Sequence, residues 1–132
     1  MPKKHLIAIV DDDESVCSAL RSLMRSLGFA AKAFPSAEAF LASSSPRRTS
    51  CLIVDVNMPR MTGPALHRHL LASGTNIPTI LITAYPDNSV REAALKEKAI
   101  CFLTKPFDER ELLACVHSAL GTADRSSYVT DS

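Results

Sequence analysis

Short apolar runs divide the chain at regular intervals. Four of them lack the polar alternation of a half-exposed strand: Leu6–Val10, Cys51–Val54, Thr79–Ile82 and Ile100–Leu103. Unbroken apolar runs of this length are typical of strands that are buried on both faces, as in parallel sheets covered by helices. A weaker run, Phe29–Phe34, is expected to form an edge strand.

Stretches with the apolar spacing of helices lie between these runs. One apolar stripe extends over residues 14–27 and precedes Gly28, a residue type that often follows a helix end. Ser36 is expected to open a short helix that reaches about Ala42. The pair Gly63-Pro64 places a proline near the first turn of another helix.

Two further helices are expected nearer the C-terminus. Asn88 or Ser89 could cap the first, which reaches about Lys98, and Asp108 could cap the second over Glu109–Leu120, before Gly121. Strand and helix thus alternate five times, which predicts an α/β protein with an open, doubly wound, five-stranded parallel sheet. One domain is expected over residues 1–121, followed by a flexible tail or the start of a linker over residues 122–132.

Composition and charge restrict the class of protein. The 132 residues are 46% apolar, which is enough to fill one core. The 15 lysines and arginines nearly balance the 14 acidic residues, so no general attraction to nucleic acid or to a membrane surface is expected. The first apolar run stops at Asp11, too early for a signal peptide or a membrane span, and the cytoplasm is the expected compartment.

The four cysteines are far apart in the chain and form no CxxC pair; they are Cys17, Cys51, Cys101 and Cys115. Cys51 and Cys101 fall within apolar runs. We therefore interpret the cysteines as buried, reduced thiols rather than as a disulfide or a metal site.

Polar residues with reactive side chains follow the apolar runs. In open α/β sheets, ligands bind at the carboxyl ends of the strands, so these positions are candidates for a site. Their spacings fit whole strand-and-helix units, which would bring the four groups to one rim of the sheet. The groups are Asp11-Asp12-Asp13, Asp55-Val56-Asn57, Thr83-Ala84 and Thr104-Lys105-Pro106.

These residue types suit phosphoryl transfer. Crowded carboxylates repel one another, and Mg²⁺ would neutralise them because it prefers oxygen ligands and completes its shell with water and phosphate. Lys105 and Thr83 would bind the remaining phosphoryl oxygens, and an aspartate beside them can act as the nucleophile. Each residue alone is more often a solvated loop residue, a helix cap or a strand-end hydroxyl, but their joint occurrence at successive strand ends favours a site.

The chain resembles the response regulator receiver family over about residues 5–121. Four phrases carry the resemblance: IVDDDES at 9–15, LIVDVNMPRMTG at 52–63, ILITAY at 80–85 and FLTKPF at 102–107. The run SAEAFL at 36–41 is similar to FixJ-like receivers in particular. The resemblance implies a flavodoxin-like strand order of 2-1-3-4-5 with helices on both faces.

The resemblance also implies a role for each residue of the rim. Asp55 would accept a phosphoryl group from a phosphohistidine on a sensor histidine kinase. Lys105, whose bond to Pro106 is expected to be cis, would pair with that group, and the backbone N–H of Ala84 would contact it. Mg²⁺, for which Mn²⁺ could substitute, would be held by the carboxylates of Asp12 and Asp55, by the backbone carbonyl of Asn57, and by Asp11 through a water molecule.

A switch is implied as well. Thr83 would swing toward the phosphoryl oxygens, and Phe102 would turn inward to fill the space that Thr83 leaves. The surface of the fourth helix, fifth strand and fifth helix, about residues 88–120, would signal to a downstream output domain or protein, with dimerisation on phosphorylation as one outcome. The chain would be mainly a signalling protein that catalyses only its own phosphorylation and slow dephosphorylation.

Some positions depart from the family pattern or lie outside it. Lys98 stands where the family usually has glycine, so the turn after the fourth helix is expected to be strained or rearranged. Tyr85 could shield an acyl phosphate from water. His67 and His69 are two residues apart, do not face each other on a helix, and are interpreted as a solvated pair rather than a metal site.

Two other functions compete with this interpretation. The run from Asp11 to Asp13 also fits the DxD motif of haloacid-dehalogenase-type phosphatases, in which Asp11 would be the nucleophile, but that hypothesis leaves the segment from Asp55 to Pro59 unexplained. The other alternative is a pseudo-receiver, a binding module that signals without phosphate. The presence of the full set of rim residues argues against it.

Overall fold

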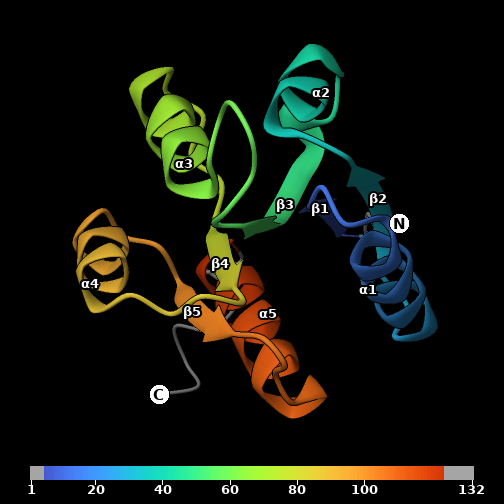
Figure 1. The fold of residues 1–132 in the computed structure, drawn as a ribbon. Helices are drawn as coiled ribbons and strands as arrows, with labels where there is room; N and C mark the ends of the chain where they lie inside the picture. Colours follow the sequence, from blue (N-terminus) through green and yellow to red (C-terminus); the bar gives the residue numbers. More distant parts are fainter. Residues whose placement is uncertain (1–4, 124–132) are drawn as a thin grey trace.

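The computed structural model describes residues 5–123 and has the predicted α/β architecture (Figure 1). Five parallel strands form one sheet in the order β2-β1-β3-β4-β5, as predicted. The strands are β1 (Leu6–Val10), β2 (Ala30–Phe34), β3 (Thr49–Asp55), β4 (Thr79–Thr83) and β5 (Cys101–Thr104). The helices are α1 (Glu14–Ser26), α2 (Ala37–Ala42), α3 (Gly63–Ala72), α4 (Asn88–Lys96) and α5 (Glu109–Ala123), with a 3-10 turn, η1 (Pro46–Arg48), before β3.

Each face of the sheet has its own apolar core. Helices α1 and α5 cover one face, where their side chains pack against Ile9, Ile53 and Ile82 of the central strands. Helices α2, α3 and α4 cover the other face and pack against Leu52 and Leu81. Successive strand residues point to opposite faces. Because both faces are covered, the central strands show no polar alternation, which explains why the sequence located them.

Helix ends differ from the prediction at two places. Asp87, rather than Asn88 or Ser89, caps α4, since its carboxylate accepts hydrogen bonds from the backbone N–H groups of Ser89 (2.9 Å) and Val90 (3.3 Å). Asp and Asn are both good helix caps, and Asp87 and Asn88 follow each other directly after a proline. The sequence alone therefore did not decide which of these neighbouring residues caps the helix.

Helix α5 begins at Glu109, directly after Asp108, as predicted. The side chain of Asp108 accepts a hydrogen bond from the backbone N–H of Arg110 (2.8 Å). The helix then continues through Gly121 to Ala123, so the predicted end before Gly121 is wrong. A glycine ends a helix where its φ is positive, as in Gly28 at φ 93°, and Gly121 keeps helical backbone instead. Of the predicted tail, residues 124–132 lie outside the described residues.

Lys98 occupies a left-handed position after α4. Its φ is 70°, and its backbone N–H donates to the carbonyl of Leu95 (3.0 Å) while that of Ala99 donates to Ala94 (3.0 Å). These two bonds close a Schellman-type helix end, a position that favours glycine because a side chain is strained there. The expectation of strain at Lys98 is therefore confirmed.

The prediction of four reduced cysteines is wrong for two of them. A disulfide joins Cys101 on β5 to Cys115 on α5, whereas Cys17 and Cys51 are free and buried. Both paired residues lie on the side of the sheet that α1 and α5 cover. The 14-residue separation does not show that a strand position and a helix position face each other, so the sequence could not predict this pair.

The prediction for the two histidines of α3 is correct for one of them. His69 is exposed, but His67 is only 3% exposed, and its Nδ1 has no hydrogen-bond partner within residues 5–123. Burial lowers the pKa of His67, and the nearby Arg68 lowers it further, while Glu97 at the end of α4 acts in the opposite direction. Arg68 and Glu97 form an ion pair at 3.3 Å beside it.

Among the described residues, no helix is long and apolar enough to cross a membrane.

Candidate functional site

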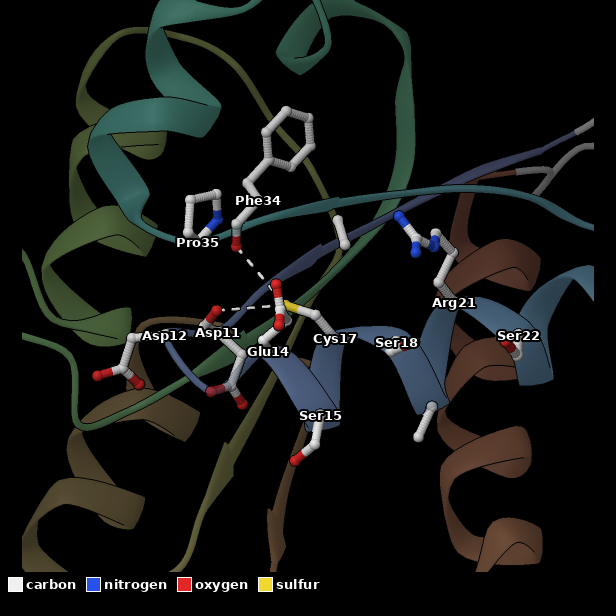
Figure 2. A pocket seen from close by; sticks show the side chains of 12 residues that line it. Asp11, Asp12, Glu14, Ser15, Cys17, Ser18, Arg21, Ser22, Phe34 and Pro35 are labelled. Carbon is white, nitrogen blue, oxygen red and sulfur yellow. Dashed lines mark hydrogen bonds between the residues drawn. The ribbon is translucent and has the colours of Figure 1, made fainter.

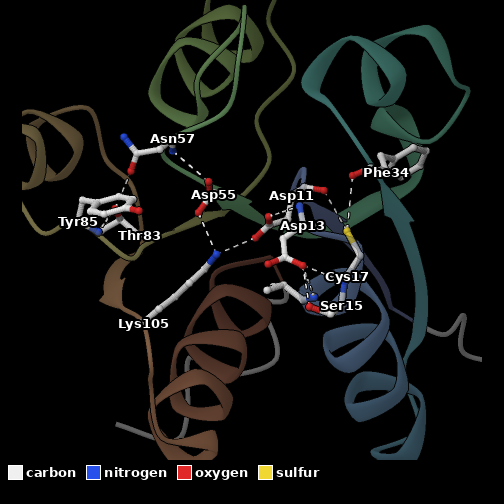
Figure 3. Close-up of polar contacts among 11 residues, drawn as sticks. Asp11, Asp13, Ser15, Cys17, Phe34, Asp55, Asn57, Thr83, Tyr85 and Lys105 are labelled. Carbon is white, nitrogen blue, oxygen red and sulfur yellow. Dashed lines mark hydrogen bonds and ion pairs between the residues drawn. The ribbon is translucent and has the colours of Figure 1, made fainter.

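The polar groups that follow the strands meet at one edge of the sheet (Figure 3). Asp11 directly follows β1, Asp55 is the last residue of β3, and Thr83 is the last residue of β4. Lys105 comes just after β5. Because all five strands run in the same direction, their carboxyl ends lie together, and residues up to 94 positions apart come into contact.

Lys105 bridges two buried carboxylates. Its Nζ lies 3.0 Å from Asp11 Oδ2 and 3.1 Å from Asp55 Oδ1. The side chains of Asp11 and Asp55 are 1% and 7% exposed, so one ammonium group balances two nearly dehydrated acids. Burial and the charge of Asp11 raise the pKa of Asp55, although Lys105 acts to lower it. Burial alone would lower the pKa of Lys105, but its bonds to the two carboxylates outweigh that effect and raise it.

Backbone N–H groups hold the other oxygen of each acid. The N–H of Asp13 donates to Asp11 Oδ1 (2.8 Å), and the N–H of Asn57 donates to Asp55 Oδ2 (3.1 Å). These bonds orient both carboxylates before any ligand arrives.

The three consecutive aspartates after β1 have different surroundings. Asp11 is buried in the ion pair, and Asp12 is exposed. Asp13 caps α1 by accepting hydrogen bonds from Ser15 and Val16, and the bonds to Ser15 lower the pKa of Asp13. The helix-cap interpretation is therefore correct for Asp13, and the other two remain candidates for the site.

Oxygen ligands suitable for a cation lie close together. Asp11, Asp12 and Asp55 each offer a carboxylate oxygen, and these three atoms lie within 4.8 Å of one another. The donor set contains only oxygen, and it carries three negative charges against the single positive charge of Lys105. A hard divalent cation such as Mg²⁺ fits this donor set and this charge.

Thr83 is fully buried and is held by two hydrogen bonds. Its Oγ1 donates to Asn57 Oδ1 (2.8 Å) and accepts a bond from the backbone N–H of Tyr85 (3.0 Å). Ala84 is exposed, and the Tyr85 side chain is 75% exposed. The hydroxyl thus lies beside the Asp55 loop but bonds to Asn57 rather than to Asp55 (Figure 3).

The β5 strand carries the remaining candidates. Phe102 is half-buried, pairs in register with Leu81 of β4, and packs against the core under α3 and α4. The bond between Lys105 and Pro106 is cis, as expected, and the backbone N–H of Lys105 donates to the carbonyl of Thr83 (2.7 Å). This hydrogen bond joins the ends of β4 and β5 at the residue whose side chain forms the ion pair.

Gly63 is a site residue that the sequence analysis treated only as a helix start. Its N–H donates to the carbonyl of Val56 (3.2 Å), and a Cβ at this position would overlap the backbone carbonyl of Asp55. The first turn of α3 therefore lies directly against the residue that carries the central carboxylate. The glycine in LIVDVNMPRMTG was the available signal, but a sequence alone does not distinguish close approach from a turn.

An open groove of about 900 Å³ extends from the acidic rim along α1 (Figure 2). Asp11 and Asp12 line one end, and Arg21 and Ser22 line the far end. On its floor, Cys17 Sγ donates to the backbone carbonyl of Asp11 (3.2 Å). Burial and the charge of Asp11 raise the pKa of the Cys17 thiol, so it stays protonated.

Comparisons with known proteins agree with this arrangement. Residues 7–117 match the response regulator receiver domain family. The chain is 44% identical over 121 residues to response regulator protein TmoT of Ectopseudomonas mendocina and 36% identical over 121 residues to transcriptional regulatory protein FixJ of Azorhizobium caulinodans. Each match covers 92% of this chain but only 55% and 57%, respectively, of the relative. The chain thus spans about half the length of the curated relatives it matches.

Solved structures show the same fold. The crystal structure of FixJ-N superimposes with a TM-score of 0.81 at 36% identity, and the alignment covers 90% of this chain and 95% of that one. The response regulator StyR gives a TM-score of 0.86 at 40% identity over 95% of this chain and 64% of that one. The chain therefore belongs to the response regulator receiver domain family, and within it the chain is FixJ-like.

Proposed function

We propose that the chain is a phosphorylation-dependent switch in which Asp55 accepts a phosphoryl group from a sensor histidine kinase. One observation supports this above all: Asp55 lies at the centre of the rim, with Lys105 on one oxygen and the N–H of Asn57 on the other. The membership of the chain in the receiver family supports it independently.

The reaction follows from the charges at the rim. A carboxylate oxygen of Asp55 attacks the phosphorus of a phosphohistidine, the P–N bond breaks, and its electron pair returns to the imidazole of the donor. The Lys105 ammonium, already 3.1 Å from Asp55, balances the negative charge that arrives. Burial keeps water away from the acid and strengthens this interaction.

Asp11, Asp12 and Asp55, with the backbone carbonyl of Asn57, would hold Mg²⁺ or Mn²⁺. The bound cation supplies charge neutralisation to the transferred oxygens. Asp11 would act through a water molecule, as the resemblance to receivers implies, while its two oxygens keep their bonds to Lys105 and to the N–H of Asp13.

The switch would begin at Thr83. Its hydroxyl would leave Asn57 Oδ1 and move toward the phosphoryl oxygens, which the N–H of Ala84 would also contact. Phe102 would then turn into the space that Thr83 leaves, because an empty cavity at a fully buried position would destabilise the fold. The change would reach the surface of α4, β5 and α5, about residues 88–120.

The partners follow from the same proposal. A downstream output domain or protein would read that surface, and dimerisation on phosphorylation is one way to transmit the signal. The receiver would occupy residues 1–121, with 122–132 as a tail or the start of a linker, and would act in the cytoplasm without binding nucleic acid itself. FixJ carries the name transcriptional regulatory protein, which fits an output domain beyond this segment.

Incubation with acetyl phosphate and Mg²⁺, followed by intact-mass measurement, tests the proposal. We expect a gain of about 80 Da that requires Mg²⁺ and is absent in Asp55→Asn. A pseudo-receiver would show no gain in the wild type under conditions that phosphorylate another receiver.

Tyr85 offers a test of how long the phosphoryl group stays. We propose that its ring shields the acyl phosphate from water, which predicts slow dephosphorylation. Tyr85→Ala should shorten the phosphate half-life, and Tyr85→Phe, which keeps the ring, should not. An unchanged or longer half-life in Tyr85→Ala would refute the shielding role.

A further inference from the structure

We propose that Cys101 and Cys115 form a redox-active site in which a dithiol reductant opens the disulfide and a small-molecule disulfide closes it. The bond joins β5 to α5, and the two Cα atoms are 6.1 Å apart, which is within the usual range for a disulfide. This site is separate from the phosphoryl chemistry, so it does not depend on the proposed function of Asp55.

The position of the pair favours a bond that reductants can reach. Strand β5 is at the edge of the sheet, and Cys101 is half-buried, whereas Cys115 is 7% exposed. The incoming thiolate would therefore attack at the Cys101 sulfur. Accessible disulfides are generally the labile or regulatory ones, and in a cytoplasmic protein, as proposed above, a lasting structural disulfide is uncommon.

The exchange balances in atoms and electrons. A thiolate of the reductant attacks Cys101 Sγ, the S–S bond breaks, and its electron pair goes to Cys115 Sγ, which takes up a proton. The second thiol of the reductant then attacks the mixed disulfide and releases Cys101. Two electrons and two protons pass from the dithiol to the protein, and the reductant becomes the disulfide; closure of the bond reverses these steps with a small disulfide as the oxidant.

The other two cysteines do not compete for this chemistry. Cys51 is 0% exposed, and burial raises its pKa to about 12. Cys17 is 7% exposed, and its pKa is raised by burial and by Asp11. Thiol exchange needs an accessible thiolate, so both remain inert while the pair between β5 and α5 reacts.

The bond closes a ring over residues 101–115 that contains Lys105. Within the ring the chain leaves β5, passes the cis bond to Pro106 and enters α5. Outside the bond, apolar contacts hold α5 to the sheet through Leu112 and Val116. Reduction should therefore loosen the segment around Lys105 while the domain stays folded.

Counting thiols in a series of glutathione redox buffers tests the site. After native incubation, denaturation and alkylation, we expect two labels under oxidising conditions, on Cys17 and Cys51, and four under reducing conditions. Cys51→Ala should pass from one label to three, because it keeps the pair. Cys115→Ser should show three labels under reducing conditions, and under oxidising conditions its unpaired Cys101 should carry a glutathione mixed disulfide, seen as added mass, instead of an internal bond.

Two results would overturn the proposal. Four labels in every buffer would mean that the bond does not form, and two labels after native treatment with a dithiol would mean that it is an inaccessible structural bond.

The loosening has its own readout. We expect amide hydrogen exchange to speed up within residues 101–115 on reduction and to stay unchanged in β1. The oxidised form should also unfold at a temperature higher by about 10 °C, from the entropy of a ring this size. Equal amide exchange in the oxidised and reduced forms would show that the disulfide does not constrain the segment around Lys105.

Discussion

Replacing Gly63 with alanine tests how closely α3 must approach the central carboxylate. The added methyl group would overlap the backbone carbonyl of Asp55 and would lie 3.1 Å from Leu81 Cδ2. The Asp55 carbonyl belongs to a buried strand and cannot rotate aside as a flexible side chain can. Gly63 also precedes Pro64, and a Cβ before proline disfavours the helical conformation that this residue adopts.

The expected cost follows from these contacts. Forcing an extra carbon into a packed site costs typically about 1–3 kcal/mol, and we take the upper end of this range because the obstacle is the backbone of Asp55. Alanine usually gains about 0.5–1 kcal/mol relative to glycine within a helix, but the following proline removes part of that gain at position 63. The net loss is therefore about 2 kcal/mol of unfolding free energy, or about 8 °C in Tm. A shift of β3 by a few tenths of an ångström would also lengthen the 3.1 Å contact between Asp55 and Lys105.

Urea and thermal unfolding measure the loss, and Gly121→Ala is the matched control. At Gly121 a methyl group would meet no atom of the described residues within 4 Å, so this variant should be as stable as the wild type or more stable by up to about 1 kcal/mol. Gly63→Ala should in addition take up phosphate at Asp55 more slowly. If Gly63→Ala is as stable as Gly121→Ala, the close packing of α3 against Asp55 is not a real constraint.

Three further predictions concern charge, backbone and pH. Lys105→Met leaves the two bridged carboxylates without their partner, and urea unfolding at neutral pH should show a loss of about 2 kcal/mol that Mg²⁺ partly restores; unchanged stability would contradict the ion pair. Lys98→Gly should stabilise the domain by about 1 kcal/mol in thermal unfolding, while Lys96→Gly, within the same helix, should destabilise it; a loss in both would contradict strain at position 98. Burial lowers the pKa of folded His67 below its unfolded value, so wild-type stability should fall as pH drops below about 6.5. His67→Gln should flatten that dependence between about pH 5 and 8. Equal slopes of stability against pH in the two proteins would exclude His67 as the cause.

The sequence predicted the sheet and the rim because both depend on strong local patterns. Strands buried on both faces leave unbroken apolar runs, and parallel strands bring the residues after them together. Asp11, Asp55 and Lys105 could therefore be placed on one edge without knowledge of any distance. Their shared ion pair, with the burial that raises the pKa of Asp55, required the structure.

Other features depend on contacts between distant elements and could not be predicted. His67 is polar and lies on a helix with exposed neighbours, so its burial depends on how α3 packs within the fold. The pairing of Cys101 with Cys115 depends on the rotation of α5 about its axis. Gly121 shows the opposite error, because a residue type that often ends helices lies within one here.

The most direct test of the phosphoacceptor is to trap the acyl phosphate. Borohydride reduces an aspartyl phosphate to homoserine, so phosphorylation in acetyl phosphate and Mg²⁺ followed by reduction and peptide mapping identifies the acceptor residue. The account predicts homoserine at position 55 and at no other aspartate of the rim. Homoserine at Asp11 would contradict it and would favour a phosphatase-type nucleophile.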